Sequence, residues 1–235
     1  MKGPNRDRVD SIHSSPPEWV VTEDGSLTLY DPHVDETFHS THGARTESQY
    51  IFVEQALARS EADPVRVLEV GWGTGLNGLL SLLYAQKERV RVEYISMEKY
   101  PLEAEVWGNY ATKLEDPIER ELMAALHRVD WGQAVGIGEY FTIRKLRMDA
   151  LDISPEITGP VDVIYMDAFS PEKVPELWSE EMMGRLYACG SQGCILSTYC
   201  AKGEVRRRLQ RVGFEVVRTA GPPGGKREIL VAHKR

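Results

Sequence analysis

Hydrophobic residues recur along this chain in short β-branched runs, separated by segments whose apolar positions have helical spacing. The runs predict strands over residues 65–70, 90–97, 140–147, 161–166, 194–199, 214–218 and 228–233. The intervening segments predict helices over 76–87, 179–189 and 202–212, and pieces of amphipathic helix in an irregular insertion over 102–138. This alternation indicates an α/β fold with a doubly wound, mostly parallel, seven-stranded sheet.

The first sixty residues do not follow this alternation. Two short extended runs flank Asp24-Gly25, a dipeptide typical of tight hairpin turns. A helix is predicted to begin at Thr46 or Ser48. The pattern therefore predicts a flexible N-terminus over 1–18, a small β-hairpin and a helix that cover the substrate side over 19–60, and a main domain over 61–235.

A glycine-rich loop directly follows the first predicted strand of the main domain. Glycines at 71, 73 and 75 let the backbone turn tightly and bring a ligand close to main-chain N–H groups at the start of the next helix. The G-x-G-x-G spacing differs from the dinucleotide-binding fingerprint, and it lacks the Lys-Ser or Lys-Thr of a P-loop. A tight turn without a ligand remains the alternative.

Acidic residues stand at the ends of four predicted strands. Glu69 precedes the glycine loop, where it would repel a pyrophosphate and would suit a ligand with a cationic amino-acid end, such as S-adenosylmethionine. Glu98 is placed to hold a ribose diol, and Asp149 can face an adenine amine. The alternatives are a surface ion pair of Glu98 with Lys99, and a capping role for Asp167 in the turn that follows it.

The composition is that of an ordinary globular protein, with 42% hydrophobic and 27% charged residues. No apolar run approaches the roughly 18 residues of a membrane span, and the first ten residues lack the apolar core of a signal peptide. We therefore expect a cytoplasmic protein without a membrane partner. Three cysteines without a C-x-x-C pair indicate reduced thiols. His39-x-x-His42 has no Cys or carboxylate at ligand spacing, so no metal site is predicted.

Charge is distributed unevenly along the chain. The net charge is −8, yet the segment from Lys202 to Arg235 holds ten Lys and Arg residues against three Glu residues. That segment carries +7, and the preceding 201 residues carry −15. Such asymmetry is typical of a protein that binds a polyanion through one end. A solvated basic face is the alternative.

Together, the strand-end acids, the glycine loop and an Asp-x-Phe turn resemble the Rossmann-like class I S-adenosylmethionine-dependent methyltransferases. The finer resemblance is to the methyltransferase domain of the bifunctional tRNA 5-methylaminomethyl-2-thiouridine biosynthesis enzymes (MnmC), which also occurs alone in MnmD-type proteins. It spans about residue 19 to the C-terminus through Phe38-His-Ser40, Gly43-Ala44, Glu47-Ser48, Glu69-Val-Gly-Trp-Gly-Thr-Gly-Leu-Asn77, Glu98-Lys-Tyr-Pro101, Asp167-Ala-Phe-Ser-Pro171, Trp178 and Lys226-Arg-Glu228. The sequence departs from the family at Trp72, where Phe is expected, and at Tyr199.

The resemblance implies S-adenosyl-L-methionine-dependent methylation of the exocyclic amine of 5-aminomethyl-2-thiouridine at the tRNA wobble position. It implies tRNA as the partner, and neither a membrane nor a metal. The FAD-dependent oxidoreductase of the bifunctional enzymes has no counterpart in 235 residues. A separate enzyme that makes the aminomethyl-uridine precursor is therefore an expected partner.

The strand-end pattern, the basic C-terminus and the resemblance together assign site residues. Asp167 is the predicted catalytic carboxylate, which orients the amine and accepts its proton. The predicted cofactor-binding residues are Glu69, Gly71, Trp72, Gly73, Gly75, Leu76, Asn77, Glu98, Lys99, Asp149, Ala150, Asp167 and Phe169. The predicted tRNA contacts are Phe38, Ser40, Tyr199, Arg206, Arg207, Lys226 and Arg227. Residues 38–48 either line the uridine pocket or form a covering lid, and Tyr199 either stacks on the base or only packs.

Two alternative functions share this fold. A polyamine aminopropyltransferase has similar strand-end acids, but its polycationic substrate requires an acidic channel, whereas this C-terminus is basic. A catalytically silent RNA-binding module is the other, and the intact set of carboxylates that ends in Asp167 argues against it.

Overall fold

The computed structural model describes residues 17–235. Its central sheet has eight strands in the order β10-β11-β9-β8-β4-β5-β7-β6. These strands are β4 (Val65–Val70), β5 (Val92–Glu98), β6 (Ala134–Gly136), β7 (Phe141–Arg147), β8 (Val161–Met166), β9 (Gly190–Thr198), β10 (Glu215–Ala220) and β11 (Glu228–His233). The five strands from β9 to β7 in this order are parallel, while β11 and β6 run antiparallel to their neighbours.

The α/β class and the mostly parallel sheet are confirmed, but the strand count of seven is wrong by one. The additional strand is β6, which pairs with β7 at one edge of the sheet. All three of its residues are exposed, so no alternation of apolar and polar positions marks them as a strand. The predicted irregular insertion contains β6 together with two helices.

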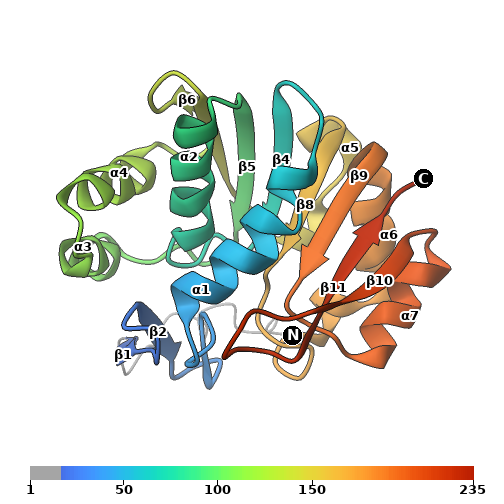
Figure 1. The fold of residues 1–235 in the computed structure, drawn as a ribbon, viewed down its shortest axis with the longest axis horizontal. Coiled ribbons are helices and arrows are strands. Elements are labelled where there is room, and N and C mark those ends of the chain that lie inside the picture. The colour runs from blue at the N-terminus through green and yellow to red at the C-terminus, as the bar shows by residue number, and fades with distance from the viewer. Residues whose placement is uncertain (1–16) are drawn as a thin grey trace, which may run out of the picture.

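Helices cover both faces of the sheet. They are α1 (Ala44–Ser48), α2 (Leu76–Glu88), α3 (Ala104–Lys113), α4 (Pro117–Arg128), α5 (Pro155–Thr158), α6 (Glu180–Cys189) and α7 (Gly203–Arg211). A π-helix, η1 (Gln49–Glu54), and three 3₁₀ helices, η2 (Leu57–Arg59), η3 (Ala150–Asp152) and η4 (Pro175–Trp178), accompany them. In Figure 1, α1 and α2 cross in front of the sheet, and α5 and α6 lie behind it. The basic helix α7 and the inserted helices α3 and α4 lie at opposite ends of the molecule.

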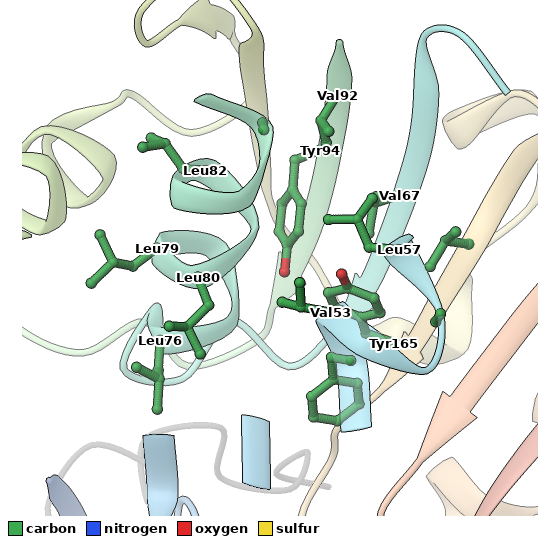
Figure 2. Packing of buried hydrophobic residues seen from close by; sticks show 14 of the residues in the cluster. Val53, Leu57, Val67, Leu76, Leu79, Leu80, Leu82, Val92, Tyr94 and Tyr165 are labelled. Atoms are coloured by element: carbon green, nitrogen blue, oxygen red, sulfur yellow. The ribbon is translucent and has the colours of Figure 1, made fainter. Parts of the chain in front are cut away.

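The front layer is closed by leucines from α2 and by residues of η1 and η2. Figure 2 shows Leu79 and Leu80 of α2 on one side, Tyr165 of the sheet on the other, and Tyr94 and Val53 between them. All five side chains are at most 2% exposed. Because this packing fixes the start of α2 against the carboxyl ends of β4 and β8, it also fixes the glycine loop.

The N-terminal part differs in two respects from its prediction. The hairpin of β1 (Glu18–Val21) and β2 (Leu27–Asp31) is confirmed, but β3 (Glu36–Thr37) adds a third strand. The predicted helix begins at Ala44, earlier than expected, and continues in η1 as a π-helix. The predicted flexible N-terminus falls mostly on residues 1–16, outside the described residues, and Glu18 already belongs to β1.

Within residues 17–235, none of the helices combines the length and the apolar composition that a membrane crossing requires.

Candidate active site

The larger of two adjoining cavities, about 280 Å³ in volume, lies beyond the carboxyl ends of β4, β5, β7 and β8. In a doubly wound sheet this edge is where ligands bind. Of the residues predicted to hold a cofactor, those that line the cavity are Gly71, Trp72, Gly73, Asn77, Glu98, Lys99, Asp149, Ala150, Asp167 and Phe169. The structure thus brings together residues that are up to 98 positions apart in the chain, from 71 to 169.

Two glycines of the loop are required by its surroundings. Gly71 has a φ of 95°, and a Cβ there would lie 2.9 Å from the main-chain oxygen of Asp167. Gly73 has a φ of 50°, and a Cβ there would lie 2.9 Å from Cδ1 of Phe38. Any side chain at these positions would be strained and would also displace a wall of the cavity.

Glu98 presents a fixed carboxylate to the cavity. Its Oε2 accepts a hydrogen bond from the Gly73 amide at 3.2 Å, and its Oε1 accepts one from the Tyr100 amide at 2.9 Å. Burial raises the pKa of Glu98, and these amides oppose the rise. Lys99 pairs with Asp149 at 2.7 Å rather than with Glu98, and this contact lowers the pKa of Asp149.

Behind the glycine loop, Asn77 bridges two carboxylates. Its Nδ2 donates to Asp167 Oδ2 at 2.7 Å and to Glu69 Oε1 at 3.0 Å. Burial raises the pKa of Glu69 to about 8 and that of Asp167 to about 7. The amide oxygen of Asn77 is buried without a hydrogen-bond partner in the described part of the chain. Asn77 also lines the larger cavity, so a ligand there would lie beside this residue.

The smaller cavity, about 120 Å³, adjoins the larger one. Among the residues that line it are four predicted substrate contacts, namely Phe38, Ser40, Tyr199 and Lys226. The residues common to both cavities are Phe38, His39, Asp167, Ala168 and Phe169. The rings of Phe38 and Phe169 meet edge to face at 5.1 Å, next to Asp167.

Segments distant in sequence close the smaller cavity. The main-chain N–H of Lys226 donates to Glu47 Oε1 at 3.2 Å across 179 residues of chain. The ammonium of Lys226 lies 4.7 Å from the ring centre of Tyr199, whose hydroxyl donates to the Ala168 carbonyl at 2.8 Å. A cation, a carboxylate and an aromatic ring therefore surround this opening.

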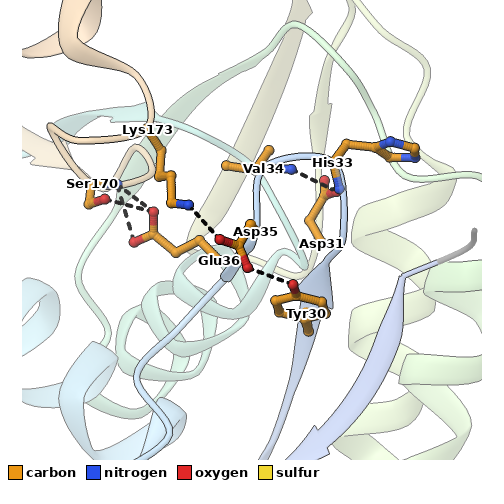
Figure 3. A network of polar contacts seen from close by, with 8 residues as sticks. All are labelled: Tyr30, Asp31, His33, Val34, Asp35, Glu36, Ser170 and Lys173. Atoms are coloured by element: carbon orange, nitrogen blue, oxygen red, sulfur yellow. Dashed lines mark hydrogen bonds and ion pairs between the residues drawn. The ribbon is translucent and has the colours of Figure 1, made fainter. Parts of the chain in front are cut away.

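The turn between β2 and β3 covers the larger cavity and is tied to the loop after β8. Asp35 accepts hydrogen bonds from Tyr30 and Lys173, at 2.7 and 2.9 Å, and Glu36 accepts from the amide and hydroxyl of Ser170 (Figure 3). The main-chain N–H of Val34 donates to the Asp31 carboxylate, which bends this turn over the opening.

Several predicted site residues line neither cavity. Glu69 is fully buried behind Asn77, while Gly75 and Leu76 start helix α2 beneath Trp72. These three residues lie behind the cavity wall and support it, and their predicted contacts with a cofactor stay a prediction. Arg206, Arg207 and Arg227 also lie outside the cavities.

These arginines lie at the carboxyl-end edge of the sheet. Thr198 at the end of β9 pairs with Leu230 near the start of β11, so the beginning of α7 and the loop before β11 share that edge. Five cations of the C-terminal segment are bound in ion pairs, namely Lys202, Arg208, Arg211, Arg218 and Arg235. Within residues 17–235, no carboxylate pairs with Arg206, Arg207, Lys226 or Arg227.

Sequence reasoning missed the support of the glycine loop by the insertion. His127 of α4 contacts the Thr74 carbonyl at 2.9 Å, and its ring meets Trp72 edge to face at 5.4 Å. Lys145 is 1% exposed and donates to the His127 carbonyl at 2.7 Å. Burial lowers the pKa of Lys145 to about 8. Lys145 alternates with Phe141 and Ile143 on the buried face of β7, and this alternation was the signal that the sequence offered.

His39 was considered only as half of a metal site. The structure places it on the wall of both cavities, with Nδ1 3.2 Å from the hydroxyl of Thr28. His42 instead pairs with Glu23 at 3.0 Å, away from His39. Among residues 17–235 no group of three or more metal-ligand side chains occurs.

Comparison with known proteins agrees with this geometry. The family described as S-adenosyl-L-methionine-dependent methyltransferase matches residues 114–235. The crystal structure of MnmC2 from Aquifex aeolicus is 30% identical with a TM-score of 0.75, and covers 94% of this chain and 71% of that chain. The chain belongs to the MnmC-type S-adenosyl-L-methionine-dependent methyltransferases.

Curated relatives are the tRNA 5-methylaminomethyl-2-thiouridine biosynthesis bifunctional proteins MnmC. That of Pseudomonas fluorescens Pf0-1 is 30% identical over 212 residues, covering 83% of this chain and 32% of the relative. That of Cupriavidus metallidurans is 29% identical over 234 residues, covering 92% and 34%. The chain thus spans about a third of the length of these MnmC proteins. Membership in this family favours methyl transfer over the aminopropyl transfer considered from the sequence.

Proposed function

We propose that this MnmC-type protein methylates the exocyclic amine of 5-aminomethyl-2-thiouridine at the wobble position of tRNA, giving 5-methylaminomethyl-2-thiouridine. The observation that carries the proposal is the meeting of two cavities at Asp167. The larger cavity has the carboxylates and the glycine loop suited to the methyl donor. The smaller one opens beside cations that lack carboxylate partners.

The residues of the larger cavity fit S-adenosyl-L-methionine, which supplies an electrophilic methyl group on a sulfonium. Glu98, held by two main-chain amides, would accept hydrogen bonds from the ribose hydroxyls. Asn77 lines the same cavity and would lie beside the methionine part. Asp149 would bind the adenine amine, and Phe169 would pack on the base.

Asp167 would orient the acceptor amine and receive its proton. An alkylammonium has a pKa near 10, so at pH 7 about one molecule in a thousand is neutral, a cost of about 4 kcal/mol. The raised pKa of Asp167, about 7, suits it as the acceptor of that proton. Orientation contributes more than basicity, because holding two reactants in place can lower a barrier by about 7–11 kcal/mol.

The unpaired cations at the same edge would bind the phosphates of tRNA. Lys226, at the smaller cavity, and Arg227 lie on the loop before β11, and Arg206 and Arg207 lie on α7. A cation without a carboxylate partner is available to a phosphate, whereas a paired one must first lose its partner. Tyr199 and Phe38 would hold the uridine that enters the smaller cavity.

Nucleoside mass spectrometry tests this function directly. Transfer RNA that carries 5-aminomethyl-2-thiouridine is incubated with the protein and S-adenosyl-L-methionine, then digested. We expect the nucleoside to gain 14 mass units, about the mass of one CH₂ group by elementary chemistry. An unchanged nucleoside, with cofactor binding demonstrated by calorimetry, would remove this substrate from consideration.

A further inference from the structure

One amide holds two carboxylates at the boundary of the two cavities. Both hydrogens of the Asn77 NH₂ group are used, one for Asp167 Oδ2 and one for Glu69 Oε1. Glu69 is 0% exposed, and Ser96 donates to its other oxygen at 2.6 Å. Glu69 is therefore a fixed anchor behind Asn77, and Asn77 in turn cannot rotate without each carboxylate losing its amide donor.

The two oxygens of Asp167 have different surroundings. Oδ2 is held by Asn77 at 2.7 Å, whereas Oδ1 has no hydrogen-bond partner within residues 17–235 and is not enclosed. Asp167 lines both cavities, so Oδ1 is the oxygen available to a substrate. The terminal torsion of an Asp side chain is soft, and the Asn77 hydrogen bond is the polar contact that restricts it among the described residues.

We infer that Asn77 is a positioning residue for methyl transfer: anchored by Glu69, it directs the free oxygen of Asp167 to the acceptor amine. The inference rests on the proposed function, in which Asp167 receives the proton of that amine. It assigns to Asn77 and Glu69 a part in the reaction that is separate from cofactor binding.

The same hydrogen bond stabilises the ionised form of Asp167. The charged and titratable groups around Asp167 are Glu69 from β4, Tyr94 from β5, Glu47 from α1, His39 after β3, Tyr199 after β9 and Lys226 before β11. Burial raises the pKa of Asp167, the Asn77 hydrogen bond and the charge of Lys226 lower it, and the charge of Glu47 raises it. Loss of the amide donor would therefore raise this pKa further.

Asn77→Ala and Asn77→Ser test the inference, with Ser81→Ala as the matched control. Ser81 lies one turn further along α2, is also buried, and contacts the Tyr165 hydroxyl instead. Methyl transfer to tRNA carrying 5-aminomethyl-2-thiouridine is measured from pH 5 to 9. For Asn77→Ala we expect the acidic limb of kcat to move up by about one pH unit and kcat at pH 7 to fall about 10- to 100-fold. Asn77→Ser keeps one hydrogen-bond donor, so its acidic limb and kcat should lie between those of the parent and those of Asn77→Ala. Ser81→Ala should retain the pH profile of the parent.

Thermal melting of the protein without ligand supplies a second readout. Because the amide stabilises ionised carboxylates, the Tm deficit of Asn77→Ala should grow between pH 5 and pH 8. A purely structural role would give the same deficit at every pH. If Asn77→Ala does not fold, Asn77→Ser is judged by the same criteria.

Two outcomes overturn the inference and are distinguishable through Asp167→Asn. Suppose that Asp167→Asn is inactive. If Asn77→Ala then keeps the acidic limb and the kcat of the parent, or if the Tm deficit of Asn77→Ala is constant with pH, only the positioning role is wrong. If Asp167→Asn is fully active, the proposed function loses its proton acceptor, and the role of Asn77 falls with it.

Discussion

The larger cavity is walled mainly by turns that directly follow the strands of one sheet, whereas the smaller cavity is closed by segments from both ends of the chain. Gly71 and Asp149 come after parallel strands and Glu98 ends one, so the sheet itself gathers them. Glu47 and Lys226 meet only because α1 and the loop before β11 pack together. Variants on the two sides should therefore separate donor binding from acceptor binding.

The largest effect is expected at the boundary, for Asp167→Asn. The substituted amide keeps the shape of the side chain and can still accept the hydrogen bond from Asn77, but it cannot take up a proton. We expect methyl transfer to fall by roughly 10²- to 10⁴-fold. Calorimetry with S-adenosyl-L-methionine and with tRNA should show both affinities within a few-fold of the parent. Retained turnover would place the proton acceptor elsewhere.

Glu98→Gln should affect the donor side alone. One of the two main-chain amides would then face an NH₂ group, and the charge that holds a ribose would be lost. A hydrogen bond to a charged group contributes about 1.5–3 kcal/mol, so S-adenosyl-L-methionine should bind about 10- to 100-fold more weakly. Binding of tRNA should not change. The control is Glu103→Gln, an exposed carboxylate nearby in the chain that lies outside the cavity.

Charge reversal of Lys226 and Arg227 to Glu should affect the acceptor side alone. Because neither side chain could then neutralise a phosphate, the slope of log K for tRNA against log salt should decrease by roughly 1.5, with little effect on the donor. Reversal of Arg211 and Arg218 gives the same change in net charge, but both are already paired, with Glu180 and Glu228. Equal effects of the two double variants would mean that only overall charge matters.

Glu69→Gln should have the smallest effect, and it should appear in stability. Burial raises the pKa of Glu69 from 4.5 to about 8, so the folded protein holds a proton that the unfolded chain releases between these values. The stability of the parent therefore decreases as the pH rises through this range. The variant lacks this titration, so near pH 5 the two Tm values should be close. At pH 8 the variant should melt several degrees higher, since a chain of this size shifts its Tm by about 2–4 °C per kcal/mol. A gain independent of pH would contradict a buried, titrating Glu69.

Elements with strong local signals agree closely with their prediction. The strand over 161–166 is observed with these bounds because its residues are almost continuously apolar, as a central parallel strand requires. Helix α6 begins after Ser179, whose hydroxyl accepts a hydrogen bond from the Met182 amide as a capping residue should. The strand β6 was missed because its exposed residues carry no distinct period, and the helix predicted over η1 was not distinguished as a π-helix.

The order of residues alone predicted the α/β class, the glycine loop and the acidic residues at the strand ends. It did so because the carboxyl ends of parallel strands lie at one edge of the sheet, whatever the details of packing. Packing in three dimensions decided which of those residues face a ligand. It buried Glu69 behind Asn77, left Asp167 between two cavities and joined Lys226 to Glu47. These contacts depend on how helices and loops cover the sheet, and neither hydrophobic period nor residue spacing encodes the distance between two segments far apart in the chain.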